Sequence, residues 1–419
     1  MQDLIPILSS ANFEVGQINR SINRETMAIA QGIVDDVKVS GMSAVRKYAE
    51  QFGERTPGQP VWIGSAELKA ASERIEPSDL EMLQRVAKRI RSFAEAQLGA
   101  LQALDVEVPG GRAGHTIEPI ARIGCYAPAG RFPLPSTVLM TAVTARTSGS
   151  EVVYVATPNP SDIMLAAAWV AGADEVAAVG GAHAIALMAH GDEDHEPCDL
   201  ICGPGSRWVT AAKKIVSGDC GIDMLAGPSE LVIIADEQAN PETVAADLLA
   251  QAEHDVDARP MLVVTGSDFA SQVTEALEQQ LNTLETAEVA KVALSKSAIV
   301  VANDLEEAIE IGNRLAPEHL ELHCQNAEEV AEKIRHAGCV FVGHDSAEVF
   351  GDYGVGPNHT LPTAGTARWS AGLNVFTFLR VRTWLRLQQA PQALIDDTAR
   401  LAELEGLHGH RNAALRRGQ

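Results

Sequence analysis

Residue types that carry out acid–base or metal chemistry gather in three short segments of the sequence. In the first, Asn240 and Pro241 are typical of a helix start, and Gln251 and His254 lie three residues apart near the end of that expected helix. Side chains at this spacing project from one face, where they can share a ligand. The alternative is a solvated last turn in which His254 interacts favourably with the helix dipole.

An adjacent carboxylate and imidazole, Glu318 and His319, form the second segment. Pro317 prevents the preceding helix from continuing simply, so we expect the pair in a loop that points both side chains into a cleft. A histidine titrates near neutrality, and a carboxylate can orient it or activate a water. As an isolated dipeptide, the pair also fits a chance occurrence on the surface.

The third segment, 351–363, has three glycines and two prolines in thirteen residues. This composition predicts a tightly shaped loop, and the loop carries Asp352 and His359. A turn with a purely structural role is the alternative.

Together the segments supply a potential set of metal ligands. Two nitrogen and two oxygen ligands come from Gln251, His254, Asp352 and one histidine of the C-terminal tail, either His408 or His410. This set suits Zn²⁺ with one or two positions left for substrate, and it suits Mn²⁺ or Co²⁺ nearly as well. The residues alone therefore predict metal-assisted chemistry beside a Glu–His acid–base pair.

Composition excludes several other classes of protein. The chain has 419 residues, 46% of them hydrophobic, and a net charge of −23, which repels phosphate backbones and anionic membrane surfaces. No apolar stretch reaches the ~18–20 residues that span a bilayer, and the N-terminus does not resemble a secretory signal. The six cysteines form no CxxC pair. We expect a soluble, cytoplasmic protein that binds neither nucleic acid nor membranes.

The elements that position these residues follow an α/β pattern. Short β-branched segments alternate with segments of helical period, which is typical of parallel sheets covered by helices. The expected strands are 152–156, 176–179, 199–202, 231–235, 261–265, 298–302 and 339–342. Helical segments are expected at 25–50, 78–104, 161–173 and 391–404. The pattern predicts two Rossmann-like, incomplete and open parallel-sheet domains, a helical N-terminal segment and a small C-terminal helical tail.

The order of the motifs resembles that of histidinol dehydrogenases over nearly the whole chain. The resemblance rests on CYAPAGRFPLPSTVLMTAV, GPGSRWVTAAKKIVSGDCGIDMLAGPSELVIIAD, VAADLLAQAEHD, NRLAPEHLEL, GDYGVGPNHTLPTAGTAR and LEGLHGH. It implies oxidation of L-histidinol to L-histidine through L-histidinal, by two hydride transfers to NAD and with a bound zinc, in the last steps of histidine biosynthesis.

The resemblance also implies roles for individual residues. The implied zinc ligands are Gln251, His254, Asp352 and His410, and the implied acid–base pair is Glu318 and His319. Substrate contacts are implied for the metal ligands and Glu318, together with Ser229, His359 and Glu405.

The same resemblance implies an intertwined homodimer in which the tail reaches the partner subunit's site. The expected division is an N-terminal segment 1–24, a first α/β domain 25–125 plus 231–372 with most of the metal and acid–base residues, a second, cofactor-side domain 126–230, and a tail 373–419.

The implied NAD contacts differ in part from the family pattern. Tyr126 matches, whereas His183 and Ser206 stand where the family has glutamine and asparagine, and Ala129 replaces a glycine. His183 could replace a hydrogen bond or face solvent. Two alternatives follow: a related zinc-dependent alcohol dehydrogenase for another small polyol or amino alcohol, or a metal and small-molecule binding homologue with weakened NAD use.

Overall fold

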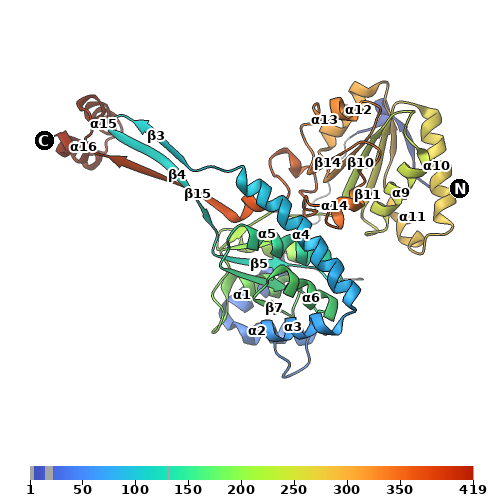
Figure 1. Cartoon of the computed structure of the whole chain (residues 1–419), viewed down its shortest axis with the longest axis horizontal. Coiled ribbons are helices and arrows are strands. Elements are labelled where there is room, and N and C mark those ends of the chain that lie inside the picture. The colour runs from blue at the N-terminus through green and yellow to red at the C-terminus, as the bar shows by residue number, and fades with distance from the viewer. Residues whose placement is uncertain (1–3, 15–21, 130–132, 419) are drawn as a thin grey trace.

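The computed structural model describes residues 4–14, 22–129 and 133–418. Figure 1 shows two α/β units that lie against each other and an arm that projects away from both and carries the C-terminus. The two units are called here the first unit and the second unit, each after its sheet.

The first unit is built on a six-stranded, fully parallel sheet. Its order is β1 (Ile7–Ser9), β12 (Ile299–Val301), β11 (Arg259–Val264), β10 (Glu230–Ala235), β13 (His319–His323) and β14 (Cys339–Val342). Alternate residues of a strand face opposite sides of a sheet. Accordingly, Leu231 and Ile233 belong to one hydrophobic cluster, with residues of α9 (Pro241–Ala252), α10 (Ser267–Leu281) and α11 (Ala287–Ser295). Val232 and Ile234 belong to another, with residues of α12 (Leu305–Leu315) and α13 (Ala327–Ala331). The short helix α14 (Glu348–Asp352) follows β14.

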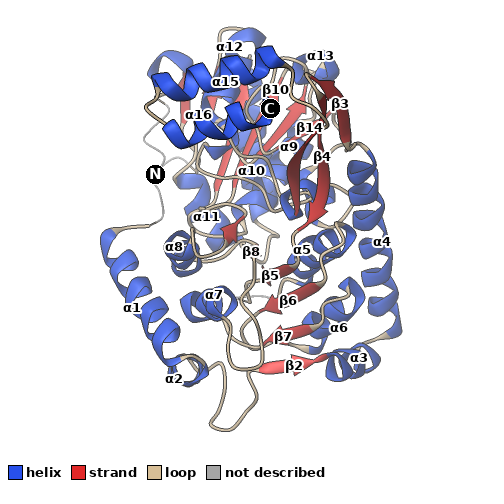
Figure 2. Ribbon diagram, turned by 90° about the vertical axis from the view of Figure 1, so that its left-hand side faces the viewer, coloured by secondary structure: helices blue, strands red, loops and turns tan. Residues whose placement is uncertain are grey.

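The second unit has a mixed sheet. Its order is β2 (Trp62–Gly64), β7 (Glu175–Ala177), β6 (Val152–Ala156), β5 (Arg122–Tyr126), β8 (Leu200–Cys202) and β9 (Gly221–Ile222), and only the β2–β7 pair is antiparallel. One face is covered by α3 (Ser65–Arg74), α4 (Pro77–Gly99), α5 (Pro135–Thr147) and α6 (Asp162–Ala171). The other is covered by α1 (Arg24–Ser40), α2 (Met42–Gln51), α7 (Gly181–His190) and α8 (Arg207–Val216), as Figure 2 shows.

The arm is a three-stranded antiparallel sheet with two helices at its end. Its strands are β15 (Leu379–Leu387), β4 (Gly111–Pro119) and β3 (Leu104–Val108), followed by α15 (Gln392–Leu404) and α16 (His408–Leu415). Short 3₁₀ helices complete the described chain: η1 (Ser10–Asn12), η2 (Thr366–Arg368), η3 (Val375–Phe378) and η4 (Arg416–Gly418).

This architecture confirms the predicted fold class of two open parallel-sheet domains with a C-terminal helical tail. The division of the chain differs from the expected one. Helices α1–α4 and strand β5, expected in the first unit, belong to the second, and β1 of the expected N-terminal segment joins the first sheet. The reason is physical: an apolar helix face shows that it is covered, but it does not show which of two sheets covers it.

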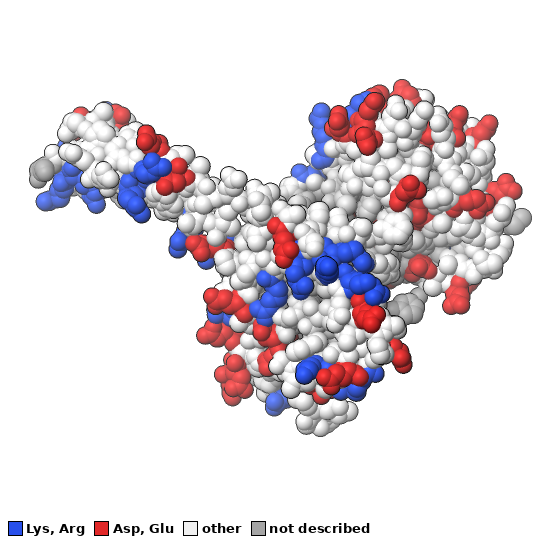
Figure 3. Space-filling model, in the orientation of Figure 1, with Lys and Arg blue, Asp and Glu red and all other residues white. Residues whose placement is uncertain are grey.

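The expected tail is also more than helix and coil. Its strand β15 pairs with β4, more than two hundred residues earlier in the chain. Strand β15 carries alternating basic and apolar residues, which are typical of an exposed ribbon. In the view of Figure 3, Lys and Arg gather over α4, whose exposed basic residues include Arg85, Lys88 and Arg89, while acidic groups are spread over both units. No helix in the described ranges has an apolar stretch that could cross a bilayer.

A buried ion pair fixes the turn that leaves β8. The side chains of Lys213 and Asp223 are 2% and 1% exposed and form an ion pair. Lys213 also donates to the carbonyl of Gly203 at 3.0 Å, and Asp223 accepts from the Gly203 N–H at 2.8 Å. The pair therefore holds the backbone of this turn from both sides.

We predict that Lys213→Met destabilises the protein by about 3–5 kcal/mol, because it leaves the Asp223 carboxylate buried without a cation. The control is Lys214→Met at the next, exposed position, which should change stability by less than about 0.5 kcal/mol. Urea unfolding measures both variants. Equal unfolding midpoints for the two would contradict the argument.

Candidate active site

The candidate site lies where the amino ends of the first sheet meet the second unit. Glu318 and His319 stand at the start of β13, and Ser229 and Glu230 stand at the start of β10, its parallel neighbour. The expected loop holds for Glu318, which lies in the bend after Pro317, but not for His319, which is the first residue of the buried strand β13. That strand fixes both side chains more firmly than a loop does.

Helix α9 brings two more residues to the same edge. It follows β10 and runs back along the sheet, so its last turn returns to the amino end of the strand. Gln251 lies in that turn, and His254 follows it with a 43% exposed side chain. Asp352 is the last residue of α14, not part of a loop as expected for 351–363, while His359 lies in the turns beyond it.

Glu318 is buried but well supplied with hydrogen bonds. Its Oε2 accepts from the Ser229 hydroxyl at 2.7 Å and from the Glu230 N–H at 2.9 Å. Burial still raises the pKa of Glu318 above its usual value. The carboxyl group is therefore held in one orientation and prefers to carry a proton more than an exposed glutamate does.

His319 is surrounded by carboxylates. Its Nδ1 lies 3.2 Å from the Glu230 carbonyl and 3.7 Å from both Glu318 Oε2 and Glu348 Oε1, and its Nε2 lies 3.7 Å from Asp352 Oδ1. Burial alone lowers the pKa of His319, but the negative charges of Glu348, Glu318 and Asp352 outweigh it and hold the pKa well above its usual value.

Asp352 lies between three imidazoles. Its carboxylate oxygens lie 3.7 Å from His254 Nε2, 3.7 Å from His319 Nε2 and 3.9 Å from His359 Nδ1. Burial favours the neutral acid, yet these three neighbours outweigh it and lower the pKa of Asp352. His359 also approaches the second unit, with its Nε2 3.4 Å from the Thr137 hydroxyl at the start of α5.

The residues present fit a divalent cation at this point. Ligand atoms of His254, Glu348 and Asp352 lie within 4.8 Å of one another. Gln251 is fully buried, and neither its amide nitrogen nor its amide oxygen has a hydrogen-bond partner in the structure. A buried amide without partners costs free energy unless a ligand completes it. His254, Glu348 and Asp352 could therefore hold a divalent cation, and the Gln251 amide, three residues before His254 in the sequence, has the unused oxygen that a further ligand would need.

The expected cofactor contacts lie at the carboxyl ends of the second sheet. Tyr126 ends β5, and its hydroxyl accepts from the Gly181 N–H at 3.1 Å; burial raises the pKa of Tyr126 to about 12. Ser206 is exposed at the N-cap of α8 and makes no side-chain cap hydrogen bond. This edge is where open α/β sheets bind ligands.

His183 is more deeply buried than we expected, whether it was to replace a hydrogen bond or to face solvent. It is 1% exposed, and its Nε2 lies 2.8 Å from Glu54 Oε2, so it does not face solvent. The same carboxylate oxygen accepts from the Gly180 N–H at 3.1 Å. His183 and Glu54 together fix the start of α7, next to the Tyr126 hydroxyl.

Two expected residues are not brought to this site within the chain. Glu405 follows α15 and His410 lies in α16, both exposed at the far end of the arm (Figure 1). The arm also exposes apolar side chains, among them Val381, Leu385, Leu401 and Leu404 at 60–67%. An apolar surface of this kind, remote from both units, is typical of a contact with another chain.

Comparison with known proteins agrees with this geometry. The family model for histidinol dehydrogenase matches residues 17–418. Histidinol dehydrogenase of Cupriavidus pinatubonensis is 39% identical over 413 residues, covering 96% of this chain and 92% of that protein. Histidinol dehydrogenase of Methanocaldococcus jannaschii is 39% identical over 405 residues, covering 95% of this chain and 94% of that protein.

The chain belongs to the histidinol dehydrogenase family. The crystal structure of histidinol dehydrogenase from Elizabethkingia anophelis superposes with a TM-score of 0.93 at 33% identity, covering 100% of this chain and 98% of that one. The resemblance inferred from the motifs is therefore confirmed, and membership in the histidinol dehydrogenase family makes the chain an oxidoreductase.

Two acidic residues of this histidinol dehydrogenase family member escaped the sequence analysis. Burial raises the pKa of Glu348 well above its usual value, and burial with the charge of Glu318 raises that of Glu230 to about 7. Signals were present for both: Glu348 lies four residues before Asp352, on the same helix face, and Glu230 follows Ser229.

We predict that Ser229→Ala lowers the free energy of unfolding by about 1.5–3 kcal/mol at neutral pH, because Glu318 loses a hydrogen bond to its carboxylate. The matched control is Ser271→Ala on the exposed face of α10, with an effect below about 0.5 kcal/mol. Urea unfolding compares the two. An equally small effect at Ser229 would show that this hydroxyl does not support Glu318.

Proposed function

We propose that this protein oxidises L-histidinol to L-histidine through L-histidinal, with NAD as hydride acceptor and one bound zinc. The observation that carries the proposal is the buried Glu318–His319 pair beside a donor set whose Gln251 amide has no partner. Family membership supports the reaction.

We assign the metal to Gln251, His254 and Asp352, completed by His410 of a second subunit. When bound, zinc would hold the substrate's amine and imidazole nitrogens, while NAD would accept the hydride. The positive charge of zinc would also offset the carboxylates around His319 and lower the pKa of His319, so that its ring is free to accept a proton. We assign the substrate to the metal ligands, Glu318, Ser229, His359 and Glu405, and the dinucleotide to the edge with Tyr126, Ser206 and, through α7, His183.

In the first oxidation, His319 takes the hydroxyl proton as the substrate carbon gives up a hydride. Its Nδ1 lies 3.2 Å from the Glu230 carbonyl, so an N–H on Nδ1 can donate to that carbonyl. In this tautomer, Nε2 is the nitrogen that faces the substrate. His319 Nε2 is buried with no hydrogen-bond partner in the structure, which fits an atom that waits for a substrate hydroxyl.

In the second oxidation, Glu318 activates a water that adds to the aldehyde carbon. Its raised pKa makes the Glu318 carboxylate a stronger base than an exposed glutamate, which suits a group that accepts a proton from water. The hydrate then gives up a second hydride while His319 accepts its hydroxyl proton. The site's carboxylates also favour a substrate that enters with a positively charged amine.

We also propose a homodimer in which each arm completes the partner's site, and a cytoplasmic location. The arm's exposed apolar residues and its separation from the rest of the site support the shared site. All six cysteines are free, which agrees with a reducing compartment.

The activity test is NADH formation from L-histidinol, with about two NADH expected per histidine and activity lost on treatment with a chelator. We expect His319→Gln to slow both oxidations by about 10²–10⁴-fold and Glu318→Gln to slow mainly the second, so that histidinal accumulates. Glu288→Gln, a 91% exposed glutamate, is the control. Product analysis by chromatography separates the two steps.

Failure would take two informative forms. NADH formed from another amino alcohol or polyol, but not from histidinol, would indicate the related zinc-dependent alcohol dehydrogenase. Zinc and histidinol binding without NADH at any NAD concentration would indicate the binding homologue. Calorimetry with NAD distinguishes that homologue from an inactive preparation of the enzyme.

The shared site predicts complementation between two inactive variants. When His319→Gln and His410→Ala chains are unfolded together and refolded, mixed dimers should form and about a quarter of all sites should have both native residues. Activity should return to about that fraction of the wild-type value. If each site were built from one chain, the mixture would stay as inactive as its parents.

A further inference from the structure

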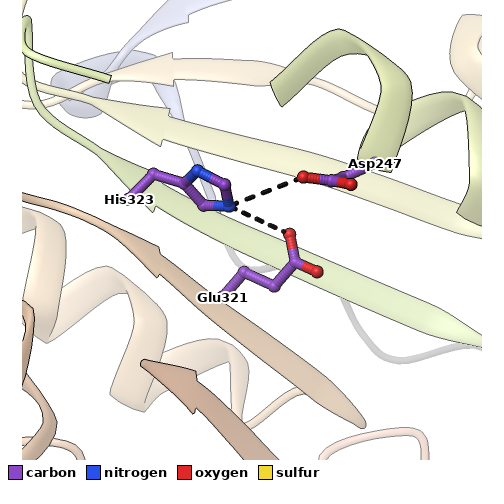
Figure 4. Close-up of side chains that lie close together, drawn as sticks. All are labelled: Asp247, Glu321 and His323. Carbon is purple, nitrogen blue, oxygen red and sulfur yellow. Dashed lines mark ion pairs between the residues drawn. The ribbon is translucent and has the colours of Figure 1, made fainter. Parts of the chain in front are cut away.

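A second cluster of buried titratable side chains lies along the seam between α9 and β13. It consists of Asp247, one turn before Gln251 on α9, and of Glu321 and His323, which follow His319 on the same face of β13. Figure 4 shows the three side chains pointing toward one another across this seam. None of them belongs to the catalytic set described above.

The cluster carries negative charge without a cation. Asp247 is 8%, Glu321 0% and His323 1% exposed. Among the residues that the structure describes, no lysine or arginine forms an ion pair with either carboxylate. Burial and the charge of Glu321 raise the pKa of Asp247 to about 7. Two carboxylates buried side by side are costly unless a positive charge compensates them.

The distances do not fit a hydrogen-bonded triad. His323 Nε2 lies 3.5 Å from Asp247 Oδ2 and 3.4 Å from Glu321 Oε2, beyond normal hydrogen-bond lengths. All three of these atoms are buried without a hydrogen-bond partner in the structure. Tetrahedral zinc with ligands at 2.0–2.1 Å separates them by about 3.3–3.4 Å. Both measured separations lie close to that edge length.

We propose that Asp247, Glu321 and His323 bind a structural divalent cation, with zinc as the metal that this ligand set fits best. One imidazole and two carboxylates neutralise a 2+ ion, and a water completes the tetrahedron. The ion ties α9 to β13. Through Glu321 the ion is also connected to α14, because the other oxygen of Glu321 accepts from the Glu348 N–H at 2.5 Å.

The test measures zinc per chain by mass spectrometry after chelator treatment, reloading with zinc and dialysis of the full-length protein. We expect about two equivalents in the wild type and about one each in Asp247→Asn and Asp352→Asn. Asp247→Asn is nearly isosteric and removes a repelling charge, so the metal-free variant should be no less stable than the metal-free wild type. The control is Asp268→Asn, an exposed aspartate of α10, which should retain about two equivalents.

The outcomes separate this site from the catalytic one. A single equivalent that is lost in Asp352→Asn and kept in Asp247→Asn would overturn the second site and leave the proposed function intact. A single equivalent lost only in Asp247→Asn would support the second site and contradict the catalytic metal assignment.

A second measurement keeps the proposal testable if the Asp247→Asn variant fails to fold. In the Asp352→Asn background, zinc should still raise the thermal unfolding midpoint, and Co²⁺ should give the visible spectrum of a tetrahedral site. Absence of both effects would mean that the carboxylates share a proton instead of a metal.

Discussion

Uncompensated negative charge at the amino ends of the first sheet is the constraint on which this structure depends. Three carboxyl groups, from Glu318, Glu348 and Asp352, surround the His319 imidazole in a largely buried volume. Among the residues that the structure describes, no lysine or arginine forms an ion pair with these three carboxyl groups. In the proposed function, the metal ion and the substrate amine would supply the positive charge that compensates these carboxylates.

The geometry of α9 explains how such distant residues meet. A helix that returns along its own strand delivers its last turn to the edge where that strand began, so Gln251 reaches the start of β10. The same return places Asp247 one turn away, beside residues further along β13. One helix–strand seam thus aligns two groups of polar side chains in a core that is otherwise aliphatic.

Sequence reasoning succeeded where a local pattern determines the structure. The β-branched runs predicted β6, β7, β8, β10, β11, β12 and β14 closely, because a buried parallel strand requires such residues. It failed at β13, where Pro317 and the charged residues of EHLELH hid a strand that is buried throughout. Polar side chains in a central strand contradict ordinary patterning, and functional sites are where such contradictions occur.

The site was predictable only in part, because some of its residues have partners that lie far away in the sequence. Family motifs identified Glu318, His319 and Asp352, and the structure brings these three together. The partnership of His183 with Glu54 joins residues more than a hundred positions apart, and no local pattern indicates it. Similarly, nothing in the sequence around Glu405 and His410 shows that they lie at the end of an arm.

The pairing of β15 with β4 has a consequence for biosynthesis. All strands of the second unit lie between residues 62 and 222, so its sheet can form while later parts of the chain are still being translated. The sheet of the arm cannot, because β4 pairs with β15, which is translated more than two hundred residues later. Until β15 is translated, β3 and β4 form an incomplete ribbon with an unpaired edge, which chaperones would recognise.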